Sequence, residues 1–315
     1  GRPAAFVKDE SVDLVYLDPP FNSNATYNVL FAEQDGAKAA AQAKAFEDTW
    51  HWDQEAAGSY QEVVESGGRV SQAMQAFRTF LGENDVLAYL AMMAPRLVEL
   101  RRVLKDTGSI YLHCDPTASH YLKMLMDAVF GAAQFRNEIV WHYKFRMMHS
   151  TRIFSRKHDI LLFYAKSPLA KLDTRAVAEP WTREEIIKTR KQEIIVDDDG
   201  GEHIWMPGPR GRSKSKLKSL EAIMEEGKAL DDVWDMPVIS SSAKERLGYP
   251  TQKPEGLLQR IIAASSREGD TVLDPFCGCG TTIAVAQRLK RSWVGIDITQ
   301  AAIVVIKKRL RDTWG

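Results

Sequence analysis

Hydrophobic positions near the start of the chain predict a strand, a long loop, a helix and a second strand, in that order. Residues 12–17 (VDLVYL) form an apolar run that leads into two consecutive prolines, which cannot continue a strand. Residues 22–68 are polar and irregular, and we expect a long loop with some helix there. Apolar residues then recur at helical spacing over 85–104, and 109–113 is again a short apolar run.

Strands continue to alternate with helices along the rest of the chain. Residues 138–143 and 159–164 are rich in β-forming side chains and predict the two strands of a long hairpin. We further expect helices over 117–130, 254–266 and 281–289, strands over 271–273 and 293–296, and a last helix from 299. This alternation predicts an α/β protein with a doubly wound, mostly parallel sheet.

A polar region punctuated by glycine and proline interrupts the alternation. We expect a main domain made of residues 1–167 and 236–315, with an inserted region over 168–235. From 144 to 220 there are 17 Lys and Arg against 10 Asp and Glu, although both classes total 42 in the whole chain. Such an excess suits contacts with nucleic-acid phosphates, whereas a single charge run is more often a solvated surface.

The basic residues gather in two clusters, one in the connection 144–157 and one in the inserted region. Two clusters beside one insertion favour nucleic-acid binding over a solvated surface. The candidate DNA-binding residues are Lys144, Arg146, Arg152, Arg156, Lys157, Arg210, Arg212, Lys214, Lys216 and Lys218.

Composition excludes several classes of protein. No run of 18 or more apolar residues is present, so we expect no membrane span. Three cysteines in no framework spacing suit a reducing cytoplasm. Cys277 and Cys279 have no second pair of Cys or His to complete a metal site, and we expect no metal.

A glycine-rich turn between a strand and a helix is the first candidate binding site. In Asp274 to Thr282 (DPFCGCGTT), glycines permit close backbone approach, and the helix that follows offers unpaired N–H groups. About twenty residues later, Asp297 ends the next strand, where a nucleoside ribose needs an acceptor. The loop lacks G-x-G-x-x-G spacing, which disfavours a pyrophosphate ligand. Alternatively the glycines make only a tight turn and Asp297 caps the last helix.

The tetrapeptide Asp18-Pro19-Pro20-Phe21 is the second candidate site. A carboxylate and a carbonyl in a stiff loop can each accept one hydrogen of an aromatic amine and so direct its lone pair. Phe21 offers a flat face on which an extruded base can stack. The alternative is an Asp-Pro turn that ends a strand. Both candidate motifs follow buried strands, so both should open at the carboxyl edge of the sheet.

Taken together, these motifs resemble the β class of DNA amino-methyltransferases, in which the catalytic motif precedes the cofactor motif. The resemblance implies a Rossmann-like methyltransferase fold with circularly permuted motif order and an inserted target-recognition domain. It assigns catalysis to Asp18, Pro19, Pro20 and Phe21. It assigns binding of S-adenosylmethionine to Thr251, Gln252, Lys253, Pro254, Asp274, Pro275, Phe276, Gly278, Gly280, Thr281, Thr282 and Asp297.

The resemblance also implies the reaction, transfer of a methyl group to N6 of a flipped adenine in duplex DNA. Asp18 favours adenine, because cytosine-N4 enzymes of this class usually carry Ser there. The alternatives are a cytosine-N4 enzyme, methylation of RNA or a protein amide, and a non-catalytic DNA-binding subunit of a modification complex. His113, at the end of a core strand, is placed to touch the substrate.

The implied partners are double-stranded DNA, a second copy of the chain and a cognate restriction endonuclease, in the cytoplasm. We expect a homodimer to form through residues 60–93. The class usually has an acidic strand upstream of the catalytic strand, but only eleven residues precede Val12. Either the chain is trimmed or that part of the pocket is built differently.

Overall fold

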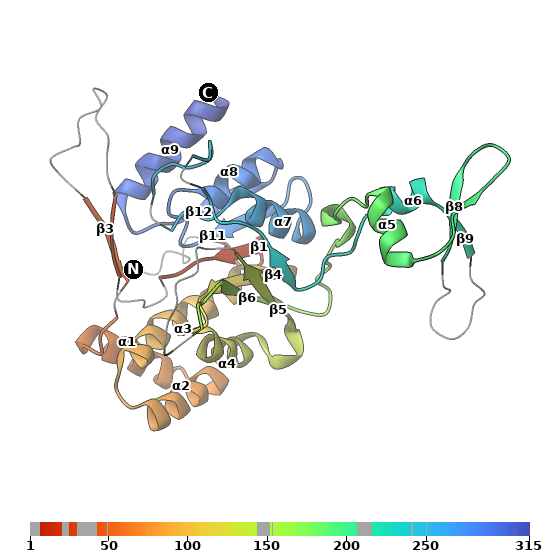
Figure 1. The fold of residues 1–315 in the computed structure, drawn as a ribbon. Helices are drawn as coiled ribbons and strands as arrows, with labels where there is room; N and C mark the ends of the chain where they lie inside the picture. The colour runs from red at the N-terminus through yellow and green to blue at the C-terminus, as the bar shows by residue number, and fades with distance from the viewer. Residues whose placement is uncertain are drawn as a thin grey trace. The chain divides into compact units, whose positions relative to one another are not determined.

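The computed structural model describes residues 7–20, 50–143, 152, 154–206, 216–240, 242–249 and 251–315, with the backbone alone over 25–29 and 43–48. Two compact units are present (Figure 1). The main unit comprises residues 1–171 and 232–315, and the small unit comprises residues 172–231. The insertion expected over 168–235 overlaps the small unit.

A seven-stranded sheet forms the centre of the main unit, in the order β10-β5-β6-β4-β1-β11-β12. Its strands are β1 (Val12–Leu17), β4 (Leu104–Cys114), β5 (Phe135–His142), β6 (His158–Ala165), β10 (Val233–Asp235), β11 (Thr271–Asp274) and β12 (Ser292–Gly295). Only β6 runs antiparallel to its neighbours, β4 and β5, while all other pairings are parallel. The expected doubly wound, mostly parallel sheet is confirmed.

Helices cover both faces of this sheet, as Figure 1 shows. The helices of the main unit are α1 (Gln54–Glu65), α2 (Gly68–Leu81), α3 (Asp85–Val103), α4 (Ser119–Phe130), α7 (Glu255–Ser265), α8 (Thr281–Arg288) and α9 (Gln300–Trp314), with a short 3-10 turn at Ala132–Gln134. None of the described helices combines the length and apolar character needed to cross a bilayer.

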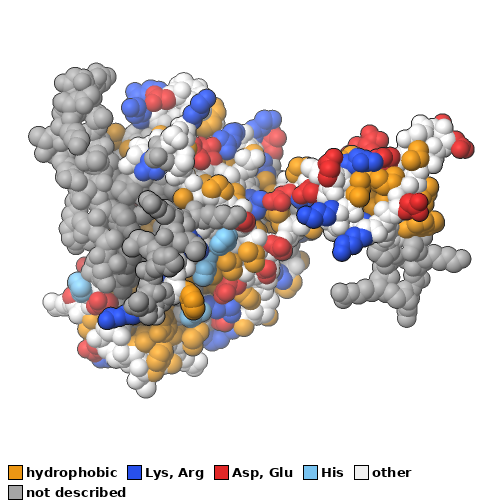
Figure 2. Space-filling view, in the orientation of Figure 1, with side chains coloured by type: hydrophobic (Ala, Val, Ile, Leu, Met, Phe, Trp, Pro, Cys, Tyr) orange, Lys and Arg blue, Asp and Glu red, His pale blue; other side chains and the backbone are white. Residues whose placement is uncertain are grey.

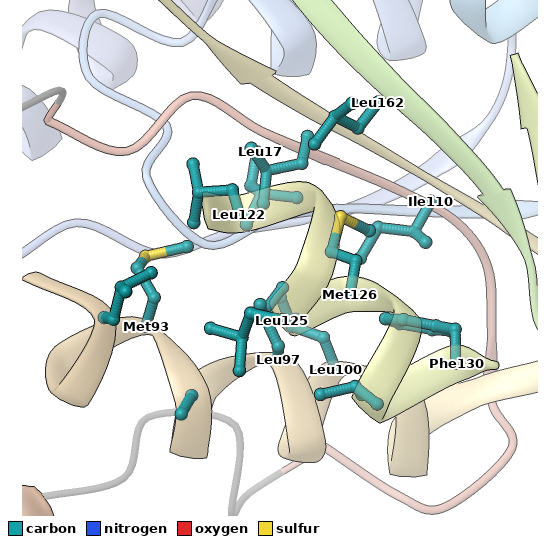
Figure 3. Packing of buried hydrophobic residues seen from close by; sticks show 14 of the residues in the cluster. Leu17, Met93, Leu97, Leu100, Ile110, Leu122, Leu125, Met126, Phe130 and Leu162 are labelled. Carbon is teal, nitrogen blue, oxygen red and sulfur yellow. The ribbon is translucent and has the colours of Figure 1, made fainter. Parts of the chain in front are cut away.

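Strand β1 is buried on both faces because each face meets a different helical layer. Val15 and Leu17 belong to one core, with α3 and α4, whereas Leu14 and Tyr16 belong to the other, with α7 and α8. This explains the uninterrupted apolar run, which is typical of a parallel strand covered on both sides. Figure 3 shows the first core, where the labelled residues are Leu17, Met93, Leu97, Leu100, Ile110, Leu122, Leu125, Met126, Phe130 and Leu162.

The region expected to be mainly loop, 22–68, contains more regular structure than predicted. Its last part forms α1, and α2 begins at Gly68, so helices start well before residue 85. In addition, the backbone of β2 (Ala25–Val29) pairs antiparallel with that of β3 (Ala43–Asp48). Helix α1 buries only Tyr60 and Val63, so its sequence carries too few apolar residues to display a helical period.

The small unit has a core of its own. It contains a 3-10 turn at Arg175–Val177, α5 (Arg183–Arg190), α6 (Leu220–Glu226) and a sheet of β7 (Ile195–Val196), β8 (Glu202–Met206) and β9 (Lys216–Ser219). A capping box between Thr182 and Glu185 begins α5. The buried residues are Ile186, Ile204, Leu220 and Ile223.

Asp13, a polar residue within β1, contacts residues at the starts of the neighbouring strands β4 and β11. Both of its carboxylate oxygens lie 2.8 Å from the Lys105 ammonium at the start of β4. One oxygen also accepts the backbone N–H of Thr271 at 2.9 Å. The Asp13 side chain is 13% exposed, so its loss would leave the part-buried Thr271 N–H without this partner, while Lys105, 40% exposed, would lose its ion pair.

We expect Asp13→Ala to lower the free energy of unfolding of the main unit by about 1–3 kcal/mol, since donors are left without a partner. Urea denaturation followed by tryptophan fluorescence measures this. Asp9→Ala is the matched control, because Asp9 is 70% exposed in its ion pair with Arg102 and should matter much less. Equal losses in the two variants would contradict the role assigned to Asp13.

Candidate functional site

The two candidate motifs lie at the carboxyl ends of adjacent parallel strands. Leu14 of β1 pairs with Val272 of β11, and Val15 pairs with Leu273. Asp18 directly follows β1 and Asp274 ends β11, so segments 256 positions apart in sequence meet at one edge of the sheet. In doubly wound sheets this edge is where ligands bind.

Asp18 is held from two sides. Its carboxylate forms an ion pair with Lys253, and both side chains are largely buried, at 16% and 12% exposed. Nδ1 of His113 lies 4.0 Å from the other carboxylate oxygen. Pro19 is buried and Pro20 is partly buried, whereas Phe21 lies outside the described residues.

The glycine-rich turn is fastened to the next strand by backbone hydrogen bonds. The Cys277 N–H donates to the Ile296 carbonyl at 3.0 Å, and the Ile296 N–H donates to the Asp274 carbonyl at 2.9 Å. Gly280 begins α8 with a φ of 75°, and a Cβ there would lie 2.6 Å from Cγ1 of Ile306. Position 280 therefore requires glycine for both its conformation and its packing.

Asp297 uses both carboxylate oxygens within the protein. One accepts the Gly278 N–H at 2.9 Å, and the other accepts the N–H and hydroxyl of Thr299, each at 2.8 Å. The Asp297 side chain thus both binds the backbone next to the last helix and closes the glycine-rich turn. Because each carboxylate oxygen has two lone pairs, a hydroxyl of a ligand can still bind.

Burial, with a smaller contribution from the negative charges of Asp18 and Asp297, raises the pKa of Asp274 to about 7. The Thr282 hydroxyl and the Phe276 N–H, 3.0 Å from Oδ1, donate hydrogen bonds that oppose this rise only in part. Asp274 is 3% exposed. A cation placed beside it would favour its ionised form.

In the segment 251–254, one residue holds the preceding loop and another contacts Asp18. Gln252 accepts the Leu247 N–H at 2.9 Å and donates to the Glu245 carbonyl at 2.6 Å, so it holds the preceding loop. Thr251 is exposed with a φ of 61°, and Pro254 is buried at the start of α7. Lys253 alone reaches the other motif, at Asp18.

Tyr249 was not expected in the site, yet it lines the glycine-rich turn. A Cβ on Gly278 would lie 3.3 Å from Cε1 of Tyr249. Burial raises the Tyr249 pKa, and the charge of Asp297 adds to the rise, so its hydroxyl remains protonated. The only available signal was its position, two residues before Thr251.

A second unexpected feature is a set of polar side chains behind Asp18. Nε2 of His113 lies 3.1 Å from Oδ2 of Asp159, and the Tyr143 hydroxyl donates to Oδ1 of Asp159 at 3.1 Å. The Tyr16 hydroxyl lies 2.9 Å from Nδ1 of His113. His113 had been expected near the site. Asp159 was not identified from the sequence, because it lies in an apolar run that predicts only a strand.

A third unexpected residue is Arg309 of α9, which braces the start of α8. Its guanidinium donates to the Thr281 hydroxyl at 3.4 Å and to the Cys279 carbonyl at 3.5 Å. An ion pair with Glu255 of α7 fixes its other side. Arg309 is 9% exposed, so the last helix contributes a buried charge to the architecture of the turn.

The predicted DNA-binding residues are only partly described. Arg152 and Arg156 are exposed, and Nη1 of Arg156 lies 3.4 Å from the Thr117 hydroxyl, while Lys157 is half-buried. In the small unit Lys216 is exposed, but Lys218 forms an ion pair with Glu226. Lys144, Arg146, Arg210, Arg212 and Lys214 lie outside the described residues.

Metal-ligating side chains do not cluster in the part of the chain that is described. No group of three or more His, Cys, Asp or Glu there could hold a metal ion.

Comparison with known proteins gives consistent matches. A family model for DNA methylases of the N6/N4 type matches residues 12–308. The type II methyltransferase M.HpaI of Haemophilus parainfluenzae is 32% identical over 222 residues, which cover 70% of this chain and 59% of that protein. The DNA adenine methyltransferase YhdJ of Escherichia coli is 30% identical over 217 residues, 68% of this chain and 64% of that protein. The chain therefore spans about three fifths of the length of these relatives.

Among solved structures, the PvuII DNA methyltransferase, named as cytosine-N4-specific, superposes with a TM-score of 0.52. The alignment covers 99% of this chain and 84% of that one at 13% sequence identity. At this level the similarity concerns the fold alone, and it agrees with the mostly parallel α/β sheet.

The raised pKa of Asp274 predicts that Asp274→Asn changes the free energy of unfolding of the ligand-free protein in a pH-dependent way. Asp274 binds its proton more tightly folded than unfolded, so its contribution to stability is complete below its ordinary pKa and is lost as pH rises towards 7. Asn has no such loss. As pH rises from 4 to 7, the free energy of unfolding of Asp274→Asn should increase by up to about 4 kcal/mol relative to that of wild type. Urea unfolding at several pH values measures the difference, and a difference that does not change with pH would refute the assignment.

Proposed function

The chain belongs to the family of N6/N4 DNA methylases, and from that premise we propose that it transfers a methyl group from S-adenosylmethionine to N6 of adenine in duplex DNA. The observation that carries the proposal is the meeting of Asp18 with Asp274 at the carboxyl edge of β1 and β11. Asp18 would contact the amine and Asp274 would contact the cofactor, from the ends of neighbouring strands.

The residues at the glycine-rich turn fit S-adenosylmethionine. Gly278 and Gly280 let the turn pack closely against Tyr249 and Ile306, and Asp297 can accept ribose hydroxyl hydrogens. Asp274, whose pKa is near 7, becomes a carboxylate more readily beside a cation, and this cofactor carries both an ammonium and a sulfonium. When bound, S-adenosylmethionine supplies an electrophilic methyl group.

The chain's own contribution to the reaction is positioning. The Asp18 carboxylate and the Pro19 carbonyl each accept one hydrogen of the amine, which directs the nitrogen lone pair towards the methyl group. Pro19 and Pro20 restrict the loop, and Lys253 restrains Asp18. The nitrogen gains the methyl group, becomes cationic, and then loses one proton to regain a neutral amine.

Adenine is favoured over cytosine by Asp18 at the head of the tetrapeptide. The similarity to YhdJ, which is named as an adenine methyltransferase, supports the same choice. Cytosine N4 presents the same kind of exocyclic amine, and the PvuII enzyme is named for that base. Product analysis separates the two.

We expect the full-length protein to place label from isotopic S-adenosylmethionine on N6 of adenine in mixed-sequence duplex DNA. Asp18→Ala should lower the rate about 10³-fold or more, since an interaction made to the reacting amine is lost. Mass spectrometry of digested nucleosides identifies the product. Asp9→Ala, which removes an exposed carboxylate, should match wild type.

Labelled N4-methylcytosine would overturn the adenine assignment. An Asp18→Ala variant as active as wild type would overturn the mechanism. Label in RNA or protein but not in DNA, with cofactor binding confirmed, would overturn the substrate class.

The small unit is proposed to read the target sequence. It exposes Trp205 and Leu217, which pair across β8 and β9 on one face of the sheet, whereas the exposed Lys216 pairs with Met206 on the other face. Figure 2 shows apolar side chains at the surface of this unit. On the face of the main unit in view, basic and acidic side chains are interspersed. The two strands thus offer a basic side chain suited to phosphate contacts and apolar side chains suited to contacts with bases.

Lys216→Ala should weaken DNA binding for all sequences and reduce the slope of log affinity against log salt by about 1. Trp205→Ala should weaken binding without changing that slope, because no charge is lost. Lys218→Ala is the matched control, since Lys218 is already paired with Glu226 and should change the slope less. Fluorescence anisotropy over a salt series measures all three, and identical slopes in the three variants would contradict the proposed contact.

A further inference from the structure

His113 lies between two carboxylates that come from different strands. The register of β1 and β4 pairs Leu17 with Leu112, which places Asp18 beside His113. Asp159, next to the start of β6, approaches from the opposite side. His113 itself is fully buried, and the ring of Trp141 packs edge-on against it at 5.6 Å between centroids. Burial of a titratable ring between two carboxylates is costly unless its polar atoms are matched.

The hydrogen bonds around His113 favour one tautomer. Burial acts to raise the pKa of Asp159, but the hydrogen bond from His113, the charge of Lys253 and the hydrogen bond from Tyr143 lower that pKa. Asp159 is thus a carboxylate and can only accept, so Nε2 of His113 carries a hydrogen and donates to it at 3.1 Å.

The other ring nitrogen faces the catalytic edge. Burial raises the pKa of Tyr16 well above its ordinary value, and the charges of Asp18, Asp274 and Asp159 add to the rise. Tyr16 therefore keeps its hydrogen and can donate it to Nδ1 of His113 at 2.9 Å. The single lone pair of Nδ1 accepts this hydrogen, and Nδ1 lies 4.0 Å from one carboxylate oxygen of Asp18. If Nδ1 gains a proton, the same Tyr16 oxygen can accept a hydrogen bond from it.

The proposed reaction creates a need for such an acceptor. Methyl transfer to a neutral amine leaves a cationic nitrogen that must release one proton, and Asp18 is the carboxylate that contacts it. A protonated Asp18 cannot serve the next turnover. Lys253, its ion-pair partner, is an ammonium with no capacity to accept.

We propose that His113 takes this proton from Asp18 and holds it as an imidazolium between Asp18 and Asp159. The proton leaves the amine nitrogen for Asp18. Asp18 then gives a proton to the Tyr16 oxygen while the Tyr16 hydrogen moves to Nδ1 of His113, which regenerates both the Asp18 carboxylate and the Tyr16 hydroxyl. Asp159 stabilises the charged ring through Nε2, and the partly buried Tyr143 donates a hydrogen bond to the other oxygen of Asp159. This inference rests on the proposed methyl transfer and adds the residues that reset its acceptor.

The charged and titratable groups around the ring come from each element packed against it. Tyr16 and Asp18 belong to β1 and the loop after it, and Asp159 belongs to β6. Tyr143 follows β5, Asp115 follows β4, and Lys253 precedes α7. Of these groups only Asp18 and Asp159 are carboxylates within 4.0 Å of the ring nitrogens.

The test is His113→Ala in the full-length protein, with free imidazole as a replacement base. We expect the first turnover to stay within a few-fold of wild type, because methyl transfer precedes the proton step. Steady-state turnover should fall about 100-fold, a typical contribution of a positioned acid or base. Added imidazole should restore at least a tenth of the lost rate, while affinity for S-adenosylmethionine stays unchanged.

Two controls separate a relay from a structural role. His142→Ala removes a half-buried imidazole that pairs with Asp235, and imidazole should not affect this variant. Tyr16→Phe keeps the His113 ring but removes the hydroxyl that contacts Nδ1, so it should lower the steady-state rate while the first turnover stays near wild type. Should His113→Ala fail to fold, Asp159→Asn keeps the shape of the site and should show the same split between first turnover and steady state.

The failures can be told apart. Wild-type protein that places no label in DNA would overturn the proposed function itself. Wild-type activity together with a normal steady state in His113→Ala would overturn the relay alone. A loss spread equally over first turnover, steady state and cofactor affinity, with no rescue by imidazole, would also overturn it.

Discussion

The parallel pairing of β1 with β4 on one side and β11 on the other is the constraint on which the site depends. It places the ends of three strands at one edge, so that Asp18, His113 and Asp274 become neighbours despite their separation in sequence. Because β1 is covered by helices on both faces, a slip of one residue would exchange the side chains of its two cores. The register is therefore fixed by burial, and the site inherits its geometry from that register.

The pKa values of two largely buried carboxyl groups at this edge are shifted in opposite directions by their surroundings. Asp274 has its pKa raised mainly by burial, and its neighbours supply only neutral hydrogen-bond donors. Asp159 is also opposed by burial, but His113 and Lys253 lower its pKa. Such a separation is typical of sites that assign different tasks to chemically identical groups. Here the pKa of Asp274 is raised in the ligand-free protein, whereas Asp159 is a carboxylate that accepts hydrogen bonds from His113 and Tyr143.

The sequence predicted the parts of this site that are local and missed those that depend on tertiary contact. Asp18 and Asp274 were found because each follows an apolar run and precedes a proline. Asp159 was missed because its partner lies 46 positions away in His113. Arg309 was missed because a single basic residue on a last helix is usually solvated, and only the packing of α9 buries it. Helix α1 escaped prediction because just two of its residues are buried.

The proposed function places chemistry in the main unit and recognition in the small unit. Among the described residues, the buried core of the small unit is built only from its own side chains, such as Ile186 and Ile204. The register of β1 and β11 is set by a different core, in the main unit. Changes to the outer face of β8 and β9 can therefore alter which surface meets DNA without moving Asp18 relative to Asp274. A fold of this kind lets the target sequence vary while the geometry that orients an amine is conserved by packing.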